Sequence, residues 1–189
     1  MRALKGEHMF KYILTNNQID LCINEVSQNN QDALKKLYDE FGKPIFLFAL
    51  SIVKDYQLAE DVAQETFLEI MASAKNYRMG TNPKAWIFSI ARNISADTLK
   101  SHYKNVLLSD EEMNDIPDLS NMSLLENRTD AFDALNTLDL LEKQIISLYL
   151  FSGLKQIEIA KVLDISYIKV RSKYGYAIKK LKNYYAKRR

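Results

Sequence analysis

The sequence predicts an all-α protein, and three observations carry this prediction. Apolar residues recur every three or four positions through most of the 189 residues, the spacing that gathers them on one face of a helix. Strand alternation and Asn-Gly hairpin signals do not interrupt residues 31–105. A hydrophobic content of 47% is sufficient to build cores. We therefore expect helices that pack through apolar faces.

The first expected helix has an apolar face made of Leu34, Leu37, Tyr38 and Phe41. After Gly42 the pattern resumes with Ile45, Phe48, Ala49 and Ile52. Pro44 suits a first helical turn, where the N–H that it lacks would have no helical partner. These residues predict a break or kink at positions 42–44.

The next helix follows Asp55 and separates its residues by polarity. Its inner face is expected to comprise Val62, Ala63, Thr66, Phe67, Ile70 and Ala74. Its outer face carries Glu60, Asp61, Gln64, Glu65 and Glu69. A third helix has the clearest start in the chain, with Asn82 as N-cap and Pro83 at the first helical position. Its buried stripe consists of Trp86, Ile87, Ile90, Ala91 and Ile94.

The C-terminal third predicts a helix near residues 139–151, then two short helices joined by a tight turn. The expected packing between the two short helices involves Ile157, Ala160, Leu163, Val170 and Tyr174. Asp164 takes the turn position, because Asp tolerates left-handed backbone, and Ser166 is the N-cap of the second helix. In proteins with this arrangement the second, basic helix lies in the DNA major groove, so the arrangement indicates a protein that reads DNA sequence.

Charge is distributed unevenly although the net charge is only +2. Residues 164–189 carry nine Lys or Arg against one Asp, a net +8, whereas residues 108–130 carry seven acids against one Arg, a net −6. These runs suggest a nucleic-acid surface and a linker in one chain, with solvated surface as the plainer alternative. We expect an N-terminal extension at 1–24, helical domains at 25–105 and 131–189, and an acidic linker at 106–130.

Several classes of function are not supported by the sequence. Cys22 is the only cysteine, and His8 and His102 are far apart, so no disulfide framework or Cys/His metal site is expected. No apolar run approaches the roughly 20 residues that cross a bilayer. The single cysteine suits a reducing compartment, so we expect a cytoplasmic protein. A phosphate loop and a nucleophile with a base are also missing, so we expect that the protein is not an enzyme and has no cofactor. We further expect translation to begin at Met9, leaving residues 1–8 untranslated.

Three segments carry a resemblance to a known family. Residues 59–67 (AEDVAQETF) and 82–97 (NPKAWIFSIARNISAD) strongly resemble region 2 of the bacterial sigma factors, and residues 153–181 resemble their region 4. The two motifs in this order, across a linker of this length, resemble the small extracytoplasmic-function (ECF) class. The resemblance extends from about Asp32 to Tyr184. It implies two small helical domains, a region 2 bundle and a region 4 helix-turn-helix, joined by a flexible acidic linker.

The resemblance implies a factor that binds RNA polymerase core and directs recognition of the −10 and −35 promoter elements. The implied polymerase contacts are the β′ clamp helices and the β flap, and an anti-sigma factor is an optional further partner. The residues that match the clamp-binding surface are Glu60, Asp61, Gln64 and Glu65. Without the family match, a solvated helix flank would be the better interpretation of these charges.

The loop before the Asn82 helix and the exposed flank of that helix match the part of region 2 that captures flipped-out −10 bases. The candidate residues are Tyr77, Arg78, Asn82, Lys84, Arg92 and Asn93. Tyr77 could stack on a base, Asn82 could read a base edge beyond its capping role, and Lys84 and Arg92 could hold phosphates. Trp86 fits the core better than a stacking role, because it shares a stripe with Ile87.

The second helix of region 4 is implied to read the −35 duplex. Its candidate residues are Tyr167, Lys169, Arg171, Ser172 and Lys173. Arg171 is the best candidate for a guanine contact, because a guanidinium can bond both guanine acceptors. The chain departs from the family at residues 168–170, where Ile-Lys-Val replaces the usual Gly-Thr-Val, so the −35 preference cannot be transferred.

A mechanism follows for the acidic linker. In related factors the linker enters the active-site cleft and RNA exit path, and a −6 segment would be attracted to that basic environment. We predict that the free protein binds promoter duplex poorly and that core binding exposes both DNA surfaces. A disordered tether without further role is the alternative for the linker. For the whole chain, a helix-turn-helix regulator that acts without polymerase is the alternative, but it leaves residues 59–97 unexplained.

Overall fold

The computed structural model describes residues 13–108 and 129–187, with side chains described over 13–102 and 133–187. These residues form helices and no strand, which confirms the predicted fold class. The N-terminal helices are α1 (Asn16–Val26), α2 (Gln31–Val53), α3 (Tyr56–Ser73), the 3₁₀ turn η2 (Ala74–Asn76) and α4 (Pro83–Leu108). The C-terminal helices are α5 (Thr129–Asn136), α6 (Leu140–Ser147), the π-helical turn η4 (Leu148–Ser152), α7 (Gln156–Leu163) and α8 (Tyr167–Ala186).

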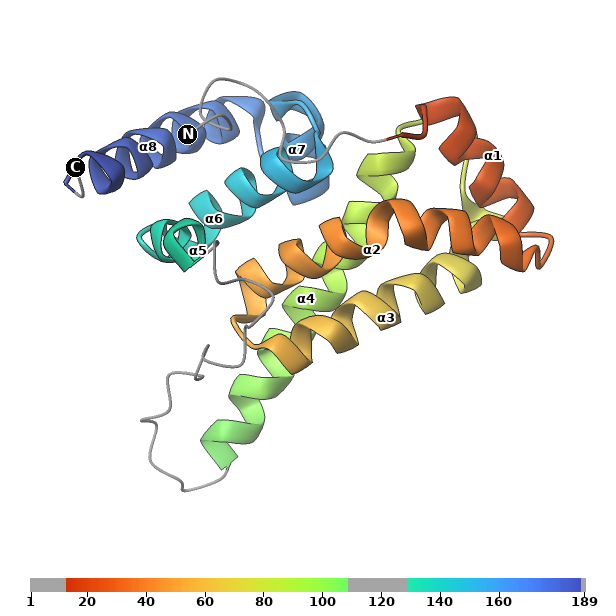
Figure 1. The fold of residues 1–189 in the computed structure, drawn as a ribbon, viewed down its shortest axis with the longest axis horizontal. Helices are drawn as coiled ribbons and strands as arrows, with labels where there is room; N and C mark the ends of the chain where they lie inside the picture. The colour runs from red at the N-terminus through yellow and green to blue at the C-terminus, as the bar shows by residue number, and fades with distance from the viewer. Residues whose placement is uncertain (1–12, 109–128, 188–189) are drawn as a thin grey trace.

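Helices α1, α3 and α4 pack around α2 (Figure 1), with α3 alongside α2 and α4 crossing both. At the centre, the ring of Phe88 on α4 lies edge-on to Phe41 and Phe48 of α2, at centroid distances of 6.4 and 5.7 Å. All three side chains are fully buried. Helices α2, α3 and α4 form where the apolar periodicity predicted helices, because each apolar stripe is covered by a neighbouring helix.

A break at residues 42–44 is ruled out, because α2 continues through Pro44 as one helix of 23 residues, whereas the alternative of a kink there stays a prediction. Proline removes a single helical hydrogen bond. Buried residues before and after it, including Phe41, Ile45 and Phe48, belong to one core cluster. Packing on both sides of Pro44 therefore holds the helix together.

Helix α1 lies mostly within residues 1–24, where the sequence predicts an N-terminal extension and no helix. It begins at a capping box in which Thr15 and Gln18 bond each other's backbone. Its buried residues are Ile19, Asp20, Cys22, Ile23 and Val26. Glu40 of α2 also accepts hydrogen bonds from the backbone N–H groups of Ile13 and Leu14, at 2.5 and 3.0 Å. Helix α1 is therefore part of the bundle, packed against α2, α4 and η2.

The predicted helix-turn-helix is present. Asp164 adopts the left-handed conformation (φ 52°) at the end of α7, and the Ser166 hydroxyl accepts a hydrogen bond from Lys169 N at 3.3 Å as the N-cap of α8. The expected burial of Ile157 is wrong, because its side chain is 55% exposed. The buried residues of α7 are Ile159, Ala160, Val162 and Leu163. Helix α7 packs against both α4 and α8, and this double contact turns Ile157 outward.

The C-terminal helices pack against the N-terminal bundle. Contacts join α6 and η4 to α2, and α7 to α4 (Figure 1). One hydrophobic cluster accordingly runs from Ile19 in α1 to Val170 in α8. A smaller cluster lies within the C-terminal part and comprises Ala134, Leu135, Leu138, Ile146, Ala177 and Leu181. Most of the expected acidic linker and the expected start at Met9 lie outside the described residues, and the domain boundaries stay a prediction.

Candidate functional site

The outer face of α3 presents all four residues predicted to bind polymerase. Glu60, Asp61, Gln64 and Glu65 are exposed, while the intervening Val62 and Ala63 are buried against neighbouring helices. The face stands as a ridge between two grooves. Glu60 and Gln64 line the groove shared with α2, whereas Asp61 and Glu65 line the groove shared with α4. The helical spacing thus distributes the four polar side chains over both flanks of one ridge.

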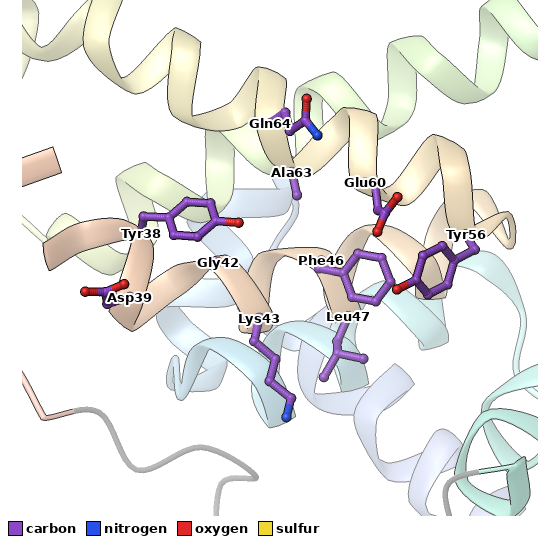
Figure 2. Close-up of a pocket in the computed structure, with 10 residues that line it drawn as sticks. All are labelled: Tyr38, Asp39, Gly42, Lys43, Phe46, Leu47, Tyr56, Glu60, Ala63 and Gln64. Carbon is purple, nitrogen blue, oxygen red and sulfur yellow. The ribbon is translucent and has the colours of Figure 1, made fainter. Parts of the chain in front are cut away.

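The groove between α2 and α3 has a volume of about 670 Å³ and combines aromatic with charged side chains. Figure 2 shows Tyr38 and Tyr56 at its two ends, with Glu60 and Gln64 along the α3 wall. The ring centroids of Tyr38 and Phe67 lie 5.0 Å apart, and so do those of Tyr56 and Phe46. Neither tyrosine is predicted to be a surface residue, because Tyr38 shares a helical stripe with buried residues and Tyr56 lies in no recognised motif.

The loop between η2 and α4 contains the first of the −10 candidates, Tyr77. Its ring packs against Trp86 at a centroid distance of 4.8 Å, and its hydroxyl donates a hydrogen bond to Asp20 Oδ1 of α1. Burial, together with this hydrogen bond, raises the pKa of Tyr77 far above its usual value. The next candidate, Arg78, is exposed. Tyr77 is therefore anchored to the protein, whereas Arg78 lies on the exposed edge of the loop.

Asn82 makes two side-chain contacts. Its Oδ1 accepts a hydrogen bond from Ala85 N at 3.0 Å, which confirms the predicted N-cap of α4. Its Nδ2 donates to Glu158 Oε1 of α7 at 2.7 Å. The other Glu158 oxygen accepts from Lys155 N at 2.6 Å, so the same carboxylate caps α7. In this arrangement both polar ends of Asn82 are occupied by protein groups.

Lys84 lies on the same side of the molecule and is half-buried. Burial lowers its pKa, and the charges of Glu40 and Glu158 oppose that shift. The last two candidates lie farther along α4, where Arg92 Nη1 donates to the exposed Asn93 Oδ1 at 3.1 Å. The structure thus brings Asn82 and Lys84 together beside α7 and leaves Arg92 and Asn93 as a separate pair.

Four of the five −35 candidates form an exposed group on the first turns of α8: Tyr167, Lys169, Arg171 and Ser172. Lys173 instead turns toward α6, where its Nζ lies 2.6 Å from Asp139 and 3.7 Å from Glu142. The hydrogen bond to Asp139 raises the pKa of Lys173, and Glu142 adds to this effect.

Glu142 is only 2% exposed and also accepts a hydrogen bond from Lys180 Nζ at 2.6 Å. The pairing of α8 with these acidic residues of α6 was not predicted. The capping box of Asp139 and Glu142 agrees with the helix predicted near residues 139–151, but it does not indicate which lysines the two carboxylates bind.

Over the described part of the chain, no group of three or more His, Cys, Asp or Glu side chains is arranged to hold a metal ion. Within the same residues, no helix is long and apolar enough to span a bilayer.

Comparison with known proteins agrees with this architecture. The family model for sigma-70 region 2 matches residues 37–105, and that for sigma-70 region 4 matches residues 134–183. The ECF RNA polymerase sigma factor SigL of Mycobacterium tuberculosis is 30% identical over 155 residues, covering 79% of this chain and 86% of SigL. SigK of a Mycobacterium strain is 22% identical, with 97% of both chains covered.

Solved structures give the same result. The sigma factor RpoE, crystallised with the anti-sigma factor NepR from Bartonella quintana, superposes with a TM-score of 0.68 at 26% identity, covering 83% of this chain and 98% of RpoE. CnrH, in complex with the cytosolic domain of CnrY, has the same fold, with a TM-score of 0.65 at 21% identity, covering 88% of this chain and 96% of CnrH.

The chain belongs to the sigma-70 family of RNA polymerase sigma factors, in its ECF class. It is therefore a subunit that binds polymerase core and directs promoter recognition and transcription initiation. The alternative of a regulator acting without polymerase is not supported, because region 2 is matched along with region 4. Sigma factors are initiation factors without catalysis of their own.

Proposed function

We propose that three surfaces divide the work of this sigma factor. The outer face of α3, with Glu60, Asp61, Gln64 and Glu65, binds the polymerase clamp helices. The loop before α4 and the adjoining part of α4 capture −10 bases, and the start of α8 reads the −35 duplex. The exposure of the α3 ridge and of the α8 group supports this division. The domain limits of 25–105, 106–130 and 131–189 are part of the same proposal.

The described arrangement corresponds to a closed form of the free protein in this proposal. The observation that carries it is the hydrogen bond from Asn82 to Glu158, at 2.7 Å, which joins the −10 surface to the helix-turn-helix. A base edge cannot reach Asn82 while this bond is made. The free protein should therefore bind promoter poorly, and polymerase core, which takes the two regions apart, should make both surfaces available.

An anti-sigma factor is a further proposed partner. RpoE, the structural relative at 26% identity, was crystallised with one. The aromatic groove between α2 and α3 is a suitable surface, since Tyr38 and Tyr56 combine apolar area with a polar edge. We further propose that the protein acts in the cytoplasm, where polymerase is found, and has no enzymatic activity or cofactor.

Core binding tests the first part of the proposal. The double variant Asp61→Ala/Gln64→Ala should lose co-purification with polymerase core while its helicity stays intact by circular dichroism. Gln31→Ala/Asp32→Ala, which removes the same two residue types from the exposed first turn of α2, is the matched control and should bind like wild type. Retention of core by the first double variant would reject the assignment of α3.

Promoter binding tests the second part. Gel-shift titration of a promoter found by run-off transcription should give a weak shift with the free protein and a strong one with the holoenzyme. Tight, sequence-specific binding by the free protein would contradict a closed form.

A further inference from the structure

An acidic residue outside the matched family segment holds the loop that precedes α4. Asp20 lies on α1, is 5% exposed and precedes the region 2 match at residues 37–105. Its two oxygens have different partners. Oδ1 accepts the hydrogen bond from the Tyr77 hydroxyl, and Oδ2 accepts one from Gly80 N at 3.1 Å. These contacts join positions 57 and 60 residues apart in the chain.

The two hydrogen bonds restrain the loop at its start and at its middle. Tyr77 follows η2 directly, and Gly80 has a left-handed conformation with φ of 78°. Asn82 fixes the end of the loop as the N-cap of α4. Arg78, Met79 and Thr81 remain exposed between these fixed points. Asp20 therefore sets the path of the loop from behind, without occupying its exposed edge.

Burial makes this restraint strong. A buried carboxylate is costly unless donors satisfy it, so the protein favours the loop conformation that supplies both donors. A loop that is already ordered loses less conformational entropy when it captures an unpaired base. The ring of Tyr77 lies against Trp86, which leaves Tyr77 as an anchor of the loop.

We infer that Asp20 is a positioning residue for capture of the unpaired −10 bases and that Tyr77 works with it as one unit. This inference rests on the proposed function of the loop. It makes α1, which precedes the region 2 family-model match, a part of the promoter-reading module. The kind of ligand concerned is single-stranded DNA whose bases are flipped from the stack.

The test uses holoenzyme assembled from the full chain and polymerase core. Two fork-junction DNA probes of a mapped promoter are compared, one with intact single-stranded −10 bases and one with abasic sites in their place. The ratio of the two affinities measures base capture. Asp20→Ala and Tyr77→Phe should each lower this ratio about tenfold, as expected for loss of a hydrogen bond to a charged group, with core affinity unchanged.

Three further variants separate positioning from folding. Asp20→Asn should recover most of the ratio, because an amide can accept from Gly80 N–H and donate to the Tyr77 oxygen. Asn24→Ala, an exposed position on the same helix, should match wild type. The double variant Asp20→Ala/Tyr77→Phe should be no worse than Asp20→Ala alone, because both changes remove one unit.

The following outcomes would overturn the inference. A wild-type ratio in folded Asp20→Ala or in Tyr77→Phe would reject it, and so would an equal loss of affinity on both probes, which would indicate a general weakening. If Asp20→Ala fails to fold, Tyr77→Phe decides. A wild-type holoenzyme that does not distinguish the probes would reject the proposed function of the loop along with the inference, whereas discrimination unaffected by the variants would reject the inference alone.

Discussion

At the residue scale, several side chains that are candidates for DNA binding also have structural partners. Asn82 caps α4 and bonds Glu158, Tyr77 bonds Asp20, and Lys173 pairs with Asp139. A polar side chain of the right type can therefore serve the fold, the function or both. The exposed residues without such partners among the described side-chain contacts, such as Lys169 and Arg171, are the stronger candidates for direct DNA contact.

The aromatic centre of the bundle gives the first prediction. Phe88 is 0% exposed and touches Phe41 and Phe48, so Phe88→Ala should lower the free energy of unfolding by about 3–5 kcal/mol, through lost burial and a cavity. Urea denaturation followed by circular dichroism measures this. Leu68→Ala, at a position 64% exposed, is the control and should change stability by less than about 0.5 kcal/mol. Equal effects would contradict the assigned core.

Lys143 gives a prediction for pH. Burial lowers its pKa to about 8, with a smaller contribution from the charge of Lys54. In the unfolded chain a lysine keeps a pKa of about 10.4. From about pH 8 to 10, the unfolded state therefore binds a proton that the folded state has released, and stability attributable to Lys143 rises with pH.

Between pH 7 and pH 9.5, wild type should gain about 2 kcal/mol of unfolding free energy relative to Lys143→Met. The difference in unfolding free energy between the two proteins cancels the contribution of other titrating groups. One such group is Cys22, because burial raises the pKa of its thiol. Lys161→Met, at an exposed lysine, should follow wild type. Parallel pH profiles for wild type and Lys143→Met would show that the lysine titrates normally.

At the scale of elements, acidic residues of α6 form ion pairs with one side of α8 and leave the basic residues on its other side exposed. Lys173 and Lys180 face the buried Glu142, while Lys169 and Arg171 face solvent. One side of α8 thus holds region 4 together, and the other side is exposed and is the side that we propose to read the duplex. The +8 net charge of the C-terminal segment overstates the charge that DNA meets.

This division predicts unequal effects on binding to the −35 duplex. In holoenzyme, Lys169→Ala should weaken binding several-fold and reduce the slope of log affinity against log salt by about 1, the loss expected for one phosphate contact. Lys173→Ala should leave that slope near wild type and lower thermal stability instead, because it removes a partner of Asp139 and Glu142. A larger slope change for Lys173→Ala than for Lys169→Ala would reject the division.

At the scale of the whole molecule, the two sigma regions share one hydrophobic cluster, and α7 lies against α4. In the proposed mechanism, a protein that spans two promoter elements exchanges these contacts for contacts with polymerase. The polar bond between Asn82 and Glu158 is a small part of the buried surface, but it is sensitive to charge. It therefore offers a way to shift the balance between closed and open forms without altering either region.

Asn82→Asp should open the molecule. Aspartate keeps the N-cap of α4 but places a second carboxylate against Glu158, and like charges at hydrogen-bonding distance repel. The radius of gyration from small-angle scattering should increase, and more so at low salt. Asn93→Asp makes the same charge change at an exposed site on α4 and should stay compact. An unchanged radius for Asn82→Asp would show that the bond does not hold the closed form.

The helical class, most helix positions, the caps at Asn82 and Ser166, and the family could all be predicted from the amino-acid sequence. These features depend on local periodicity, on capping chemistry and on short motifs, all of which are written in neighbouring residues. The sigma motifs also indicated the α3 ridge, because its polar face follows from helical spacing alone.

Other features depend on how the helices pack together. The continuity of α2 through Pro44 and the outward turn of Ile157 depend on which helices meet, and the distant hydrogen-bond partners of Asp20 and Glu142 lie 38, 57 and 60 residues away in the chain. Periodicity indicates that a face is buried but not what covers it, and a charged residue carries no local sign of its distant partner. Such contacts are set by the packing of the whole chain, so they become visible only when the helices are assembled.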